Sequence, residues 1–185
     1  MKIVETEFSK VFELIPEIHE DTRGHFFESY KKSTFKTHFK SDICFIQENQ
    51  SFSRKKFTFR GIHLQRSPFQ QTKVVRVING AVIDFVFNLN PKSPNFLKYL
   101  AFHIDSKNNK QIYLDGEYGH AFLTLEDDTI VNYKATQEYS KSHEIKICPF
   151  DKEINLDLSH YANDKEILIS KEDMNGLTIS EYISN

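Results

Sequence analysis

Cysteine and tryptophan are scarce in this chain, whose 185 residues contain two cysteines and no tryptophan. Cys44 and Cys148 both lie in apolar sequence, Ile-Cys-Phe and Ile-Cys-Pro, which favours buried thiols. Two cysteines are also too few for the disulfide framework of a small secreted protein. The composition therefore excludes a disulfide scaffold.

Long hydrophobic runs and an excess of either charge are absent as well. The longest apolar run, residues 81–89, is interrupted by Asp84 and Asn88 and is far shorter than the roughly 20 residues of a membrane-spanning helix. The first ten residues lack the apolar segment of a signal peptide. The formal net charge is −2, and lysine and arginine are spread along the chain, so no attraction to nucleic acid is expected. We therefore expect a cytoplasmic protein without a membrane or nucleic-acid partner.

What the sequence has in abundance favours β-sheet. It contains 17 phenylalanines and 8 tyrosines besides frequent β-branched residues. Short strand patterns separated by turn signals predict an all-β fold, an antiparallel barrel or jelly roll, with short peripheral helices and an irregular tail after residue 150. No repeat or linker divides the chain, so we expect one domain over residues 1–185. The strands are expected at 11–15, 25–30, 44–53, 59–65, 97–104, 111–114, 121–125 and 130–135, with polar turns at 19–24 and 106–109 and a helix over 34–39 capped by Ser33.

The stretch 59–73 combines a strand pattern with side chains capable of chemistry. The two-residue period of a strand puts His63 and Gln65 on one face, which carries no aliphatic side chain. The same period puts Arg60 on the opposite face. Either Gly61 marks a β-bulge or Arg60 serves another wall.

Residues 73–89 predict a hairpin that begins with Lys73. Asn79-Gly80 supplies the positive φ of a type I′ turn between two runs rich in Val, Ile and Phe. A base and a cation are thereby expected on rigid backbone, which a catalytic site requires. Taken alone, however, a strand histidine is more often structural than catalytic, and the same holds for each polar residue singly.

Seven blocks of polar residues occur in an order that resembles the dTDP-4-dehydrorhamnose 3,5-epimerase family of nucleotide-sugar epimerases. The resemblance covers roughly residues 10 to 175, and it is specific because the blocks agree in order and nearly in spacing. The blocks are Asp21-x-Arg23-Gly24-x-Phe26-x-Glu28, Gln47-Glu48-Asn49-x-Ser51-x-Ser53, Arg60-Gly61-Ile62-His63-x-Gln65, Lys73-Val74-Val75-Arg76-Val77 continuing to Gly80 and Asp84, Gly116-x-x-x-His120-x-Phe122, Tyr133-Lys134, and Ser170-x-x-Asp173.

The resemblance implies a cupin-like jelly roll and an isomerase that inverts C3 and C5 of a dTDP-4-keto-6-deoxyhexose, as in rhamnose-type deoxysugar biosynthesis. Such chemistry needs a base for the carbon-bound proton, an electrophile for the enolate oxygen and an acid on the opposite face. By resemblance, His63 is the base, Asp173 orients it, Tyr133 is the acid, and Lys73 is the cation near the ketone oxygen.

The resemblance also implies how the nucleotide is held. It assigns Gln47, Asn49, Arg60 and Tyr139 to the nucleoside and pyrophosphate, and His120 to the substrate pocket. It implies a homodimer in which Arg23, Phe26 and Glu28 reach the nucleotide from the partner subunit. No cofactor is expected, because the reaction involves no redox step and no dinucleotide-binding glycine motif is present. No metal is expected either, because no two of the eight histidines have the spacing of a metal-binding cupin.

The sequence departs from the family pattern mainly in residues 114–121, which the resemblance places in the pocket wall next to the sugar. An epimerase acting at C3 only, or on another nucleotide-linked 4-keto sugar such as GDP-heptose, is therefore an alternative. A non-catalytic nucleotide-sugar binding cupin is a further alternative, which the presence of His63, Asp173 and Tyr133 disfavours. A ketoisomerase of similar fold ranks lowest, because those chains lack the terminal Ser-x-x-Asp block.

Overall fold

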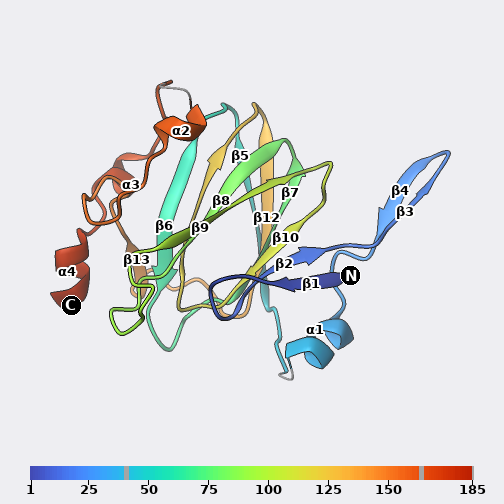
Figure 1. The fold of residues 1–185 in the computed structure, drawn as a ribbon, viewed down its shortest axis with the longest axis horizontal. Coiled ribbons are helices and arrows are strands. Elements are labelled where there is room, and N and C mark those ends of the chain that lie inside the picture. Colours follow the sequence, from blue (N-terminus) through green and yellow to red (C-terminus); the bar gives the residue numbers. More distant parts are fainter. Residues whose placement is uncertain (40–41, 163–164, 185) are drawn as a thin grey trace.

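The computed structural model describes residues 1–39, 42–162 and 165–184. Two antiparallel sheets face each other in a cupin-type jelly roll, and a separate two-stranded hairpin projects from the body (Figure 1). The C-terminal helices lie beside the five-stranded sheet, on the side opposite that hairpin. Within the described ranges, no helix has the length and apolar character needed to cross a membrane.

The strands are distributed over three sheets. The six-stranded sheet has the order β1 (Lys2–Glu5), β2 (Val11–Ile15), β10 (Gln111–Leu114), β7 (Lys73–Asn79), β12 (Thr129–Ala135) and β5 (Gln47–Ser53). The five-stranded sheet has the order β13 (Glu144–Lys146), β6 (Phe59–Gln65), β11 (Gly119–Thr124), β8 (Ala81–Phe87) and β9 (Tyr99–Asp105). The projecting hairpin consists of β3 (Ile18–Asp21) and β4 (Gly24–Phe27), and the helices are α1 (Lys32–Phe39), α2 (Ser159–Ala162), α3 (Lys171–Met174) and α4 (Ile179–Ser184).

Apolar side chains are buried on both faces of the two large sheets. Val75 and Val131 of one sheet meet Val82 and Val86 of the other in the central core. The outer face of the five-stranded sheet packs against the C-terminal tail, and the outer face of the six-stranded sheet packs against α1. Strand β8 is buried along its whole length, and its alternation leaves Asp84 on the inward face between Val82 and Val86. A carboxylate is thus built into the interior of the roll.

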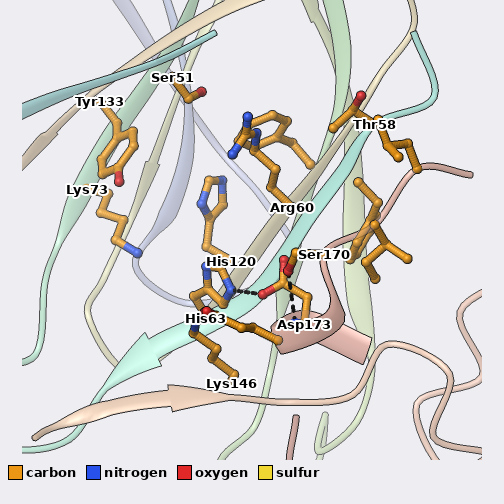
Figure 2. Close-up of a pocket in the computed structure, with 15 residues that line it drawn as sticks. Ser51, Thr58, Arg60, His63, Lys73, His120, Tyr133, Lys146, Ser170 and Asp173 are labelled. Carbon is orange, nitrogen blue, oxygen red and sulfur yellow. Dashed lines mark hydrogen bonds and ion pairs between the residues drawn. The ribbon is translucent and has the colours of Figure 1, made fainter. Parts of the chain in front are cut away.

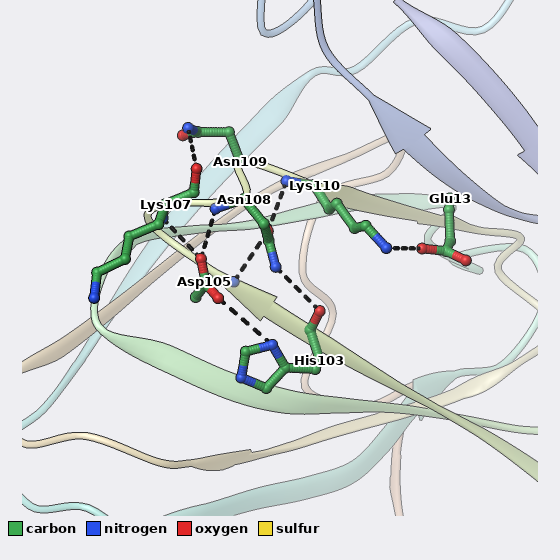
Figure 3. A network of polar contacts seen from close by, with 7 residues as sticks. All are labelled: Glu13, His103, Asp105, Lys107, Asn108, Asn109 and Lys110. Carbon is green, nitrogen blue, oxygen red and sulfur yellow. Dashed lines mark hydrogen bonds and ion pairs between the residues drawn. The ribbon is translucent and has the colours of Figure 1, made fainter. Parts of the chain in front are cut away.

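The connection from β9 to β10 crosses from one sheet to the other through the predicted turn at residues 106–109. The Asp105 carboxylate accepts the backbone N–H groups of Lys107 at 2.8 Å and Asn108 at 2.6 Å (Figure 3). The Asn108 side chain in turn accepts the N–H of Lys110, whose ammonium group lies 2.9 Å from Glu13 on β2. Side chains therefore satisfy the turn backbone and tie it to the neighbouring strand.

The predicted hairpin over residues 73–89 is wrong. Asn79-Gly80 does turn the chain, with φ +80° at Gly80, but β7 pairs with β10 and β12 whereas β8 pairs with β9 and β11. Both strands bury apolar side chains on two faces, so each is satisfied as an interior strand of its own sheet. A turn signal defines where the chain reverses and does not define the strand partner.

Smaller differences concern the edges of the fold. Residues 19–24 were expected as a turn, but Ile18–Asp21 forms strand β3 and pairs with β4. The expected strand at 25–30 ends at Phe27, the strand at 44–53 begins at Gln47, and α1 begins at Lys32, so Ser33 lies inside the helix. The strands at 11–15 and 111–114 are confirmed, whereas β1 and β13 were not predicted. The short strands depend on their partners more than on their own sequence.

Candidate active site

A β-bulge in β6 shapes the site. His63 pairs with His120 and Arg60 pairs with Phe122, so two residues of β6 oppose the single residue Ala121 between them. Gly61 has φ +128°, and a Cβ atom there would lie 2.4 Å from the Cβ of Ala121. The bulge turns Arg60 and His63 to the same side. The bulge is therefore the correct one of the two explanations that the sequence left open.

Both side chains line a cavity of about 610 Å³ inside the jelly roll. Six predicted site residues meet there from both sheets and the C-terminal tail (Figure 2): Arg60, His63, Lys73, His120, Tyr133 and Asp173. The remaining lining residues are Ser51, Thr58, Phe59, Phe122, Lys146, Leu168, Ile169, Ser170 and Glu172.

His63 forms a hydrogen-bonded pair with a carboxylate from the tail. Its Nε2 lies 2.7 Å from Oδ1 of Asp173, and Oδ2 of Asp173 accepts the backbone N–H of Gly61 at 3.3 Å. Ser170 caps α3 by accepting the N–H of Asp173, which fixes the position of that residue. Burial alone would raise the pKa of Asp173, but the bonds from His63 and Gly61 and the charge of Lys146 hold that pKa below its usual value. An ionised carboxylate only accepts, so His63 carries its hydrogen on Nε2 when neutral.

A second histidine–carboxylate pair joins the cavity wall, where His120 lies, to the buried core, where Asp84 lies. Nε2 of His120 lies 2.7 Å from Oδ2 of Asp84, and Asp84 is fully buried. Oδ1 of Asp84 has no hydrogen-bond partner among the described residues. Asp84 was assigned no role from the sequence, although it ends the motif that begins with Lys73. A carboxylate holding His120 in place gives the cavity a second oriented imidazole.

Lys73 is almost fully buried in the wall formed by β7. Burial lowers its pKa to about 8, against the opposing effect of Asp84 and Glu144. Its ammonium group lies 5.9 Å from the ring centroid of Tyr133, which is within reach of a cation–π contact. Burial, together with Glu144, raises the pKa of Tyr133, whereas Arg60 opposes the shift. Tyr133 therefore keeps its proton at neutral pH and can donate it.

Three further predicted residues form a cluster beside this wall. The Gln47 side chain donates to Oδ1 of Asn49 at 2.9 Å and accepts the backbone N–H of Tyr139 at 2.8 Å. Asn49 pairs with Tyr133 across the β5–β12 ladder. The hydroxyl of Tyr139 donates to Glu144 at 3.1 Å. Gln47, Asn49 and Ser51 lie on the half-buried face of β5, whose burial alternates along the strand.

The structure does not bring Arg23, Phe26 and Glu28 to the cavity of their own chain. Arg23 is exposed and binds Asp21 within the β3–β4 hairpin. Phe26 is 72% exposed on the same hairpin, which points away from the two large sheets (Figure 1). Glu28 follows β4 and pairs with Lys31.

Sequence reasoning missed Glu144 and Lys146, which belong to the unpredicted strand β13. Three residues carry too little pattern to identify a strand, and β13 exists through its pairing with β6. In residues 1–39, 42–162 and 165–184, no group of three or more His, Cys, Asp or Glu side chains is arranged to hold a metal. A metal-free site stays a prediction.

A jelly roll with two oriented histidines, a buried lysine and a tyrosine in one cavity has the fold and the groups of a cupin-type acid–base enzyme. The family model described as dTDP-4-dehydrorhamnose 3,5-epimerase matches residues 5–181. The chain belongs to this family, and it is therefore a nucleotide-sugar epimerase of deoxysugar biosynthesis, an isomerase.

Individual relatives agree in sequence and structure. The dTDP-4-dehydrorhamnose 3,5-epimerase of Escherichia coli K12 is 32% identical over 99% of this chain and 97% of its own length. The crystal structure of the Bacillus anthracis enzyme with TDP and PPi bound has a TM-score of 0.88 and 32% identity, covering 96% of this chain and 98% of that one. A 3'-monoepimerase from Streptomyces bikiniensis in complex with dTDP-quinovose has a TM-score of 0.91 at 28% identity, covering 98% and 89%.

Proposed function

We propose that this enzyme inverts both C3 and C5 of a dTDP-linked 4-keto-6-deoxyhexose. The observation that carries the proposal is the placement of His63 and Tyr133 on facing sheets of one cavity. Epimerisation needs a base on one face of the sugar ring and an acid on the other. Two groups on opposite walls meet that requirement without moving the ring between them.

In this proposal His63 removes the proton α to the 4-ketone. Asp173 keeps the imidazole oriented and stabilises the imidazolium that forms. The electron pair of the broken C–H bond moves into an enolate, whose oxygen is stabilised by the ammonium of Lys73 and by His120. Tyr133 then protonates the carbon from the opposite face, and proton exchange with solvent resets both groups. The reaction consumes no redox equivalent.

The nucleotide is assigned to the residues around β5. Gln47, Asn49 and Tyr139 are proposed to hold the nucleoside, and Arg60 the pyrophosphate, since its guanidinium suits phosphate oxygens. The TDP and dTDP-quinovose bound by two of the relatives support a thymidine nucleotide. The cytoplasmic location stays a prediction from the sequence.

We further propose a homodimer in which the β3–β4 hairpin of each subunit completes the nucleotide site of the other. Arg23, Phe26 and Glu28 lie outside the cavity of their own chain, and Phe26 is exposed on a hairpin that extends from the body. A large exposed aromatic ring at such a place is suited to stacking on a nucleobase. Light scattering is expected to give twice the chain mass, and a monomer would contradict this part of the proposal.

Proton NMR with dTDP-4-keto-6-deoxyglucose in D₂O tests the function. Loss of both the C3 and C5 proton signals is the expected result. Loss of the C3 signal alone would indicate an epimerase that acts at C3 only. The relative from Streptomyces bikiniensis is described as such a 3'-monoepimerase. Absence of exchange would overturn the proposed substrate, and a GDP-linked 4-keto sugar would then be the next substrate for the same assay.

A further inference from the structure

Lys146 stands in the cavity wall without a role in the catalytic scheme. It lies on β13, where it pairs with His63 of β6, and its side chain lines the cavity (Figure 2). Its ammonium group lies 2.6 Å from Oε2 of Glu172 and 3.7 Å from Oε2 of Glu144. The Lys146 side chain is 26% exposed, whereas that of Glu172 is 78% exposed. The partly buried ammonium group of Lys146 is thus paired mainly with the exposed carboxylate of Glu172.

Lys146 is close to both regions that the proposed substrate would occupy. Its ammonium group lies 3.7 Å from Glu144, which is bonded to the hydroxyl of Tyr139 in the proposed nucleoside region. Its backbone pairs with that of His63, which belongs to the His63–Asp173 pair where the sugar reacts. A diphosphate connects nucleoside and sugar in a nucleotide sugar. A substrate that spans the two regions therefore carries its negative charge past Lys146.

We propose that Lys146 binds the diphosphate of the substrate and that Glu172 is an internal anion which the diphosphate displaces. This inference rests on the proposed function, because it takes the substrate to be a nucleotide diphosphate sugar. Glu172 lies in the first turn of α3, one residue before Asp173. Its side chain can swing into solvent while the backbone that positions Asp173 stays in place.

The energetics favour such an exchange. An ion pair with one exposed partner contributes little to stability, because water solvates the carboxylate nearly as well. A diphosphate brings more negative charge to the same ammonium group, and charge-assisted contacts with phosphate are stronger. The hydrogen bond that Lys146 donates to Glu172, together with the charge of Glu144, raises the pKa of Lys146, so the side chain is a cation at neutral pH.

The other cations in the cavity wall are held differently. Arg60 already donates to Oγ of Ser53 at 3.1 Å and to the carbonyl of Phe52 at 3.0 Å. Lys73 is buried beside Asp84 and Glu144. Lys146 has a partner that can leave, so it can exchange one anion for another as the substrate enters and the product departs.

The test is calorimetry with dTDP and ligand-observed NMR with thymidine, which lacks the diphosphate. Lys146→Met is expected to weaken dTDP binding about tenfold or more, as for loss of a hydrogen bond to a charged group, and to leave thymidine binding unchanged. Lys146→Arg keeps the charge and is expected to restore most of the dTDP affinity. Glu172→Gln removes the competing charge and is expected to tighten dTDP binding severalfold. Lys98→Met, on an exposed lysine outside the cavity, is the control.

The outcomes distinguish an error in the proposed substrate from an error in the role of Lys146. If the wild-type protein does not bind dTDP, the proposed substrate is wrong. If the wild type binds dTDP and Lys146→Met binds it equally well, Lys146 does not contact the diphosphate. A parallel loss of thymidine and dTDP affinity in Lys146→Met would also overturn the inference, because it would indicate damage to the whole site. Unchanged or weaker dTDP binding by Glu172→Gln would overturn the role of Glu172.

Discussion

His63 and Asp173 are 110 residues apart in the sequence, yet Nε2 and Oδ1 of their side chains are separated by 2.7 Å. The strand β6 carries the histidine, and the short helix α3 of the C-terminal tail carries the carboxylate. The tail reaches this place because its apolar residues Ile154, Leu158 and Ile179 pack on the outer face of the five-stranded sheet. The packing of the tail therefore sets the geometry of the catalytic pair.

Replacement of Asp173 by Asn is expected to lower kcat about 10²- to 10³-fold, which lies within the roughly 10²- to 10⁴-fold contribution of general base catalysis. The amide can still form a hydrogen bond, but it does not stabilise the imidazolium by charge. KM is expected to change little, because Asp173 acts through His63. Steady-state kinetics measures both constants, and Asp42→Asn, at a carboxylate that is 65% exposed and outside the cavity, is the matched control, expected to keep kcat. A kcat within a factor of two of wild type in Asp173→Asn would contradict the role of the pair.

The depressed pKa of Asp173 also predicts a pH dependence of stability. A carboxyl group whose pKa is lower in the folded state stabilises the fold above its unfolded value of about 4. The stabilisation is lost as the pH falls through the folded pKa. The difference in unfolding free energy between wild type and Asp173→Asn is therefore expected to shrink from pH 6 to pH 3. Urea unfolding at several pH values measures it, and a difference that grows with acid would have the wrong sign.

The titration of Lys73 is expected to set the fall of kcat at alkaline pH. Its pKa of about 8 means that the ammonium group is lost as the pH rises through that value. If the cation stabilises the enolate oxygen, kcat falls above about pH 8. The profile of Lys73→Met is expected to be lower throughout and to lack this alkaline limb. An unchanged limb in Lys73→Met would assign the titration to another group.

The bulge at Gly61 gives a prediction with an internal control. Ala at this position combines an unfavourable backbone conformation with a clash against Ala121, which is expected to cost about 2–4 kcal/mol in unfolding free energy. Gly24 has nearly the same φ, +129°, but nothing lies within 4 Å of its would-be Cβ. Within its own chain, Gly24→Ala therefore reports only the cost of the unfavourable backbone conformation, and it is expected to lower the unfolding free energy less. Equal shifts of the urea midpoint in the two variants would contradict the close packing of β6 on β11.

The comparison of Arg60 with His63 illustrates how far sequence reasoning reaches. Strand periodicity identified β6 and its polar face, but a single inserted residue reverses the parity, and Gly61 indicated that bulge only as one of two explanations. Asn79-Gly80 marked a chain reversal correctly, but the partners of β7 and β8 depend on which side chains each sheet buries. Lys73, His120 and Tyr133 were found because their blocks resemble a family. Glu144 and Lys146 were missed because β13 is defined by pairing alone.

The exchange of substrate protons in two variants tests the central claim most directly. Tyr133→Phe keeps the base but lacks the acid, so it is expected to exchange the protons α to the ketone with D₂O while forming little epimer. His63→Asn lacks the base, so it is expected to show neither exchange nor epimer. Proton NMR of both reactions measures exchange and product together. Exchange by His63→Asn at the wild-type rate would contradict the account, because the proton would then leave through another group.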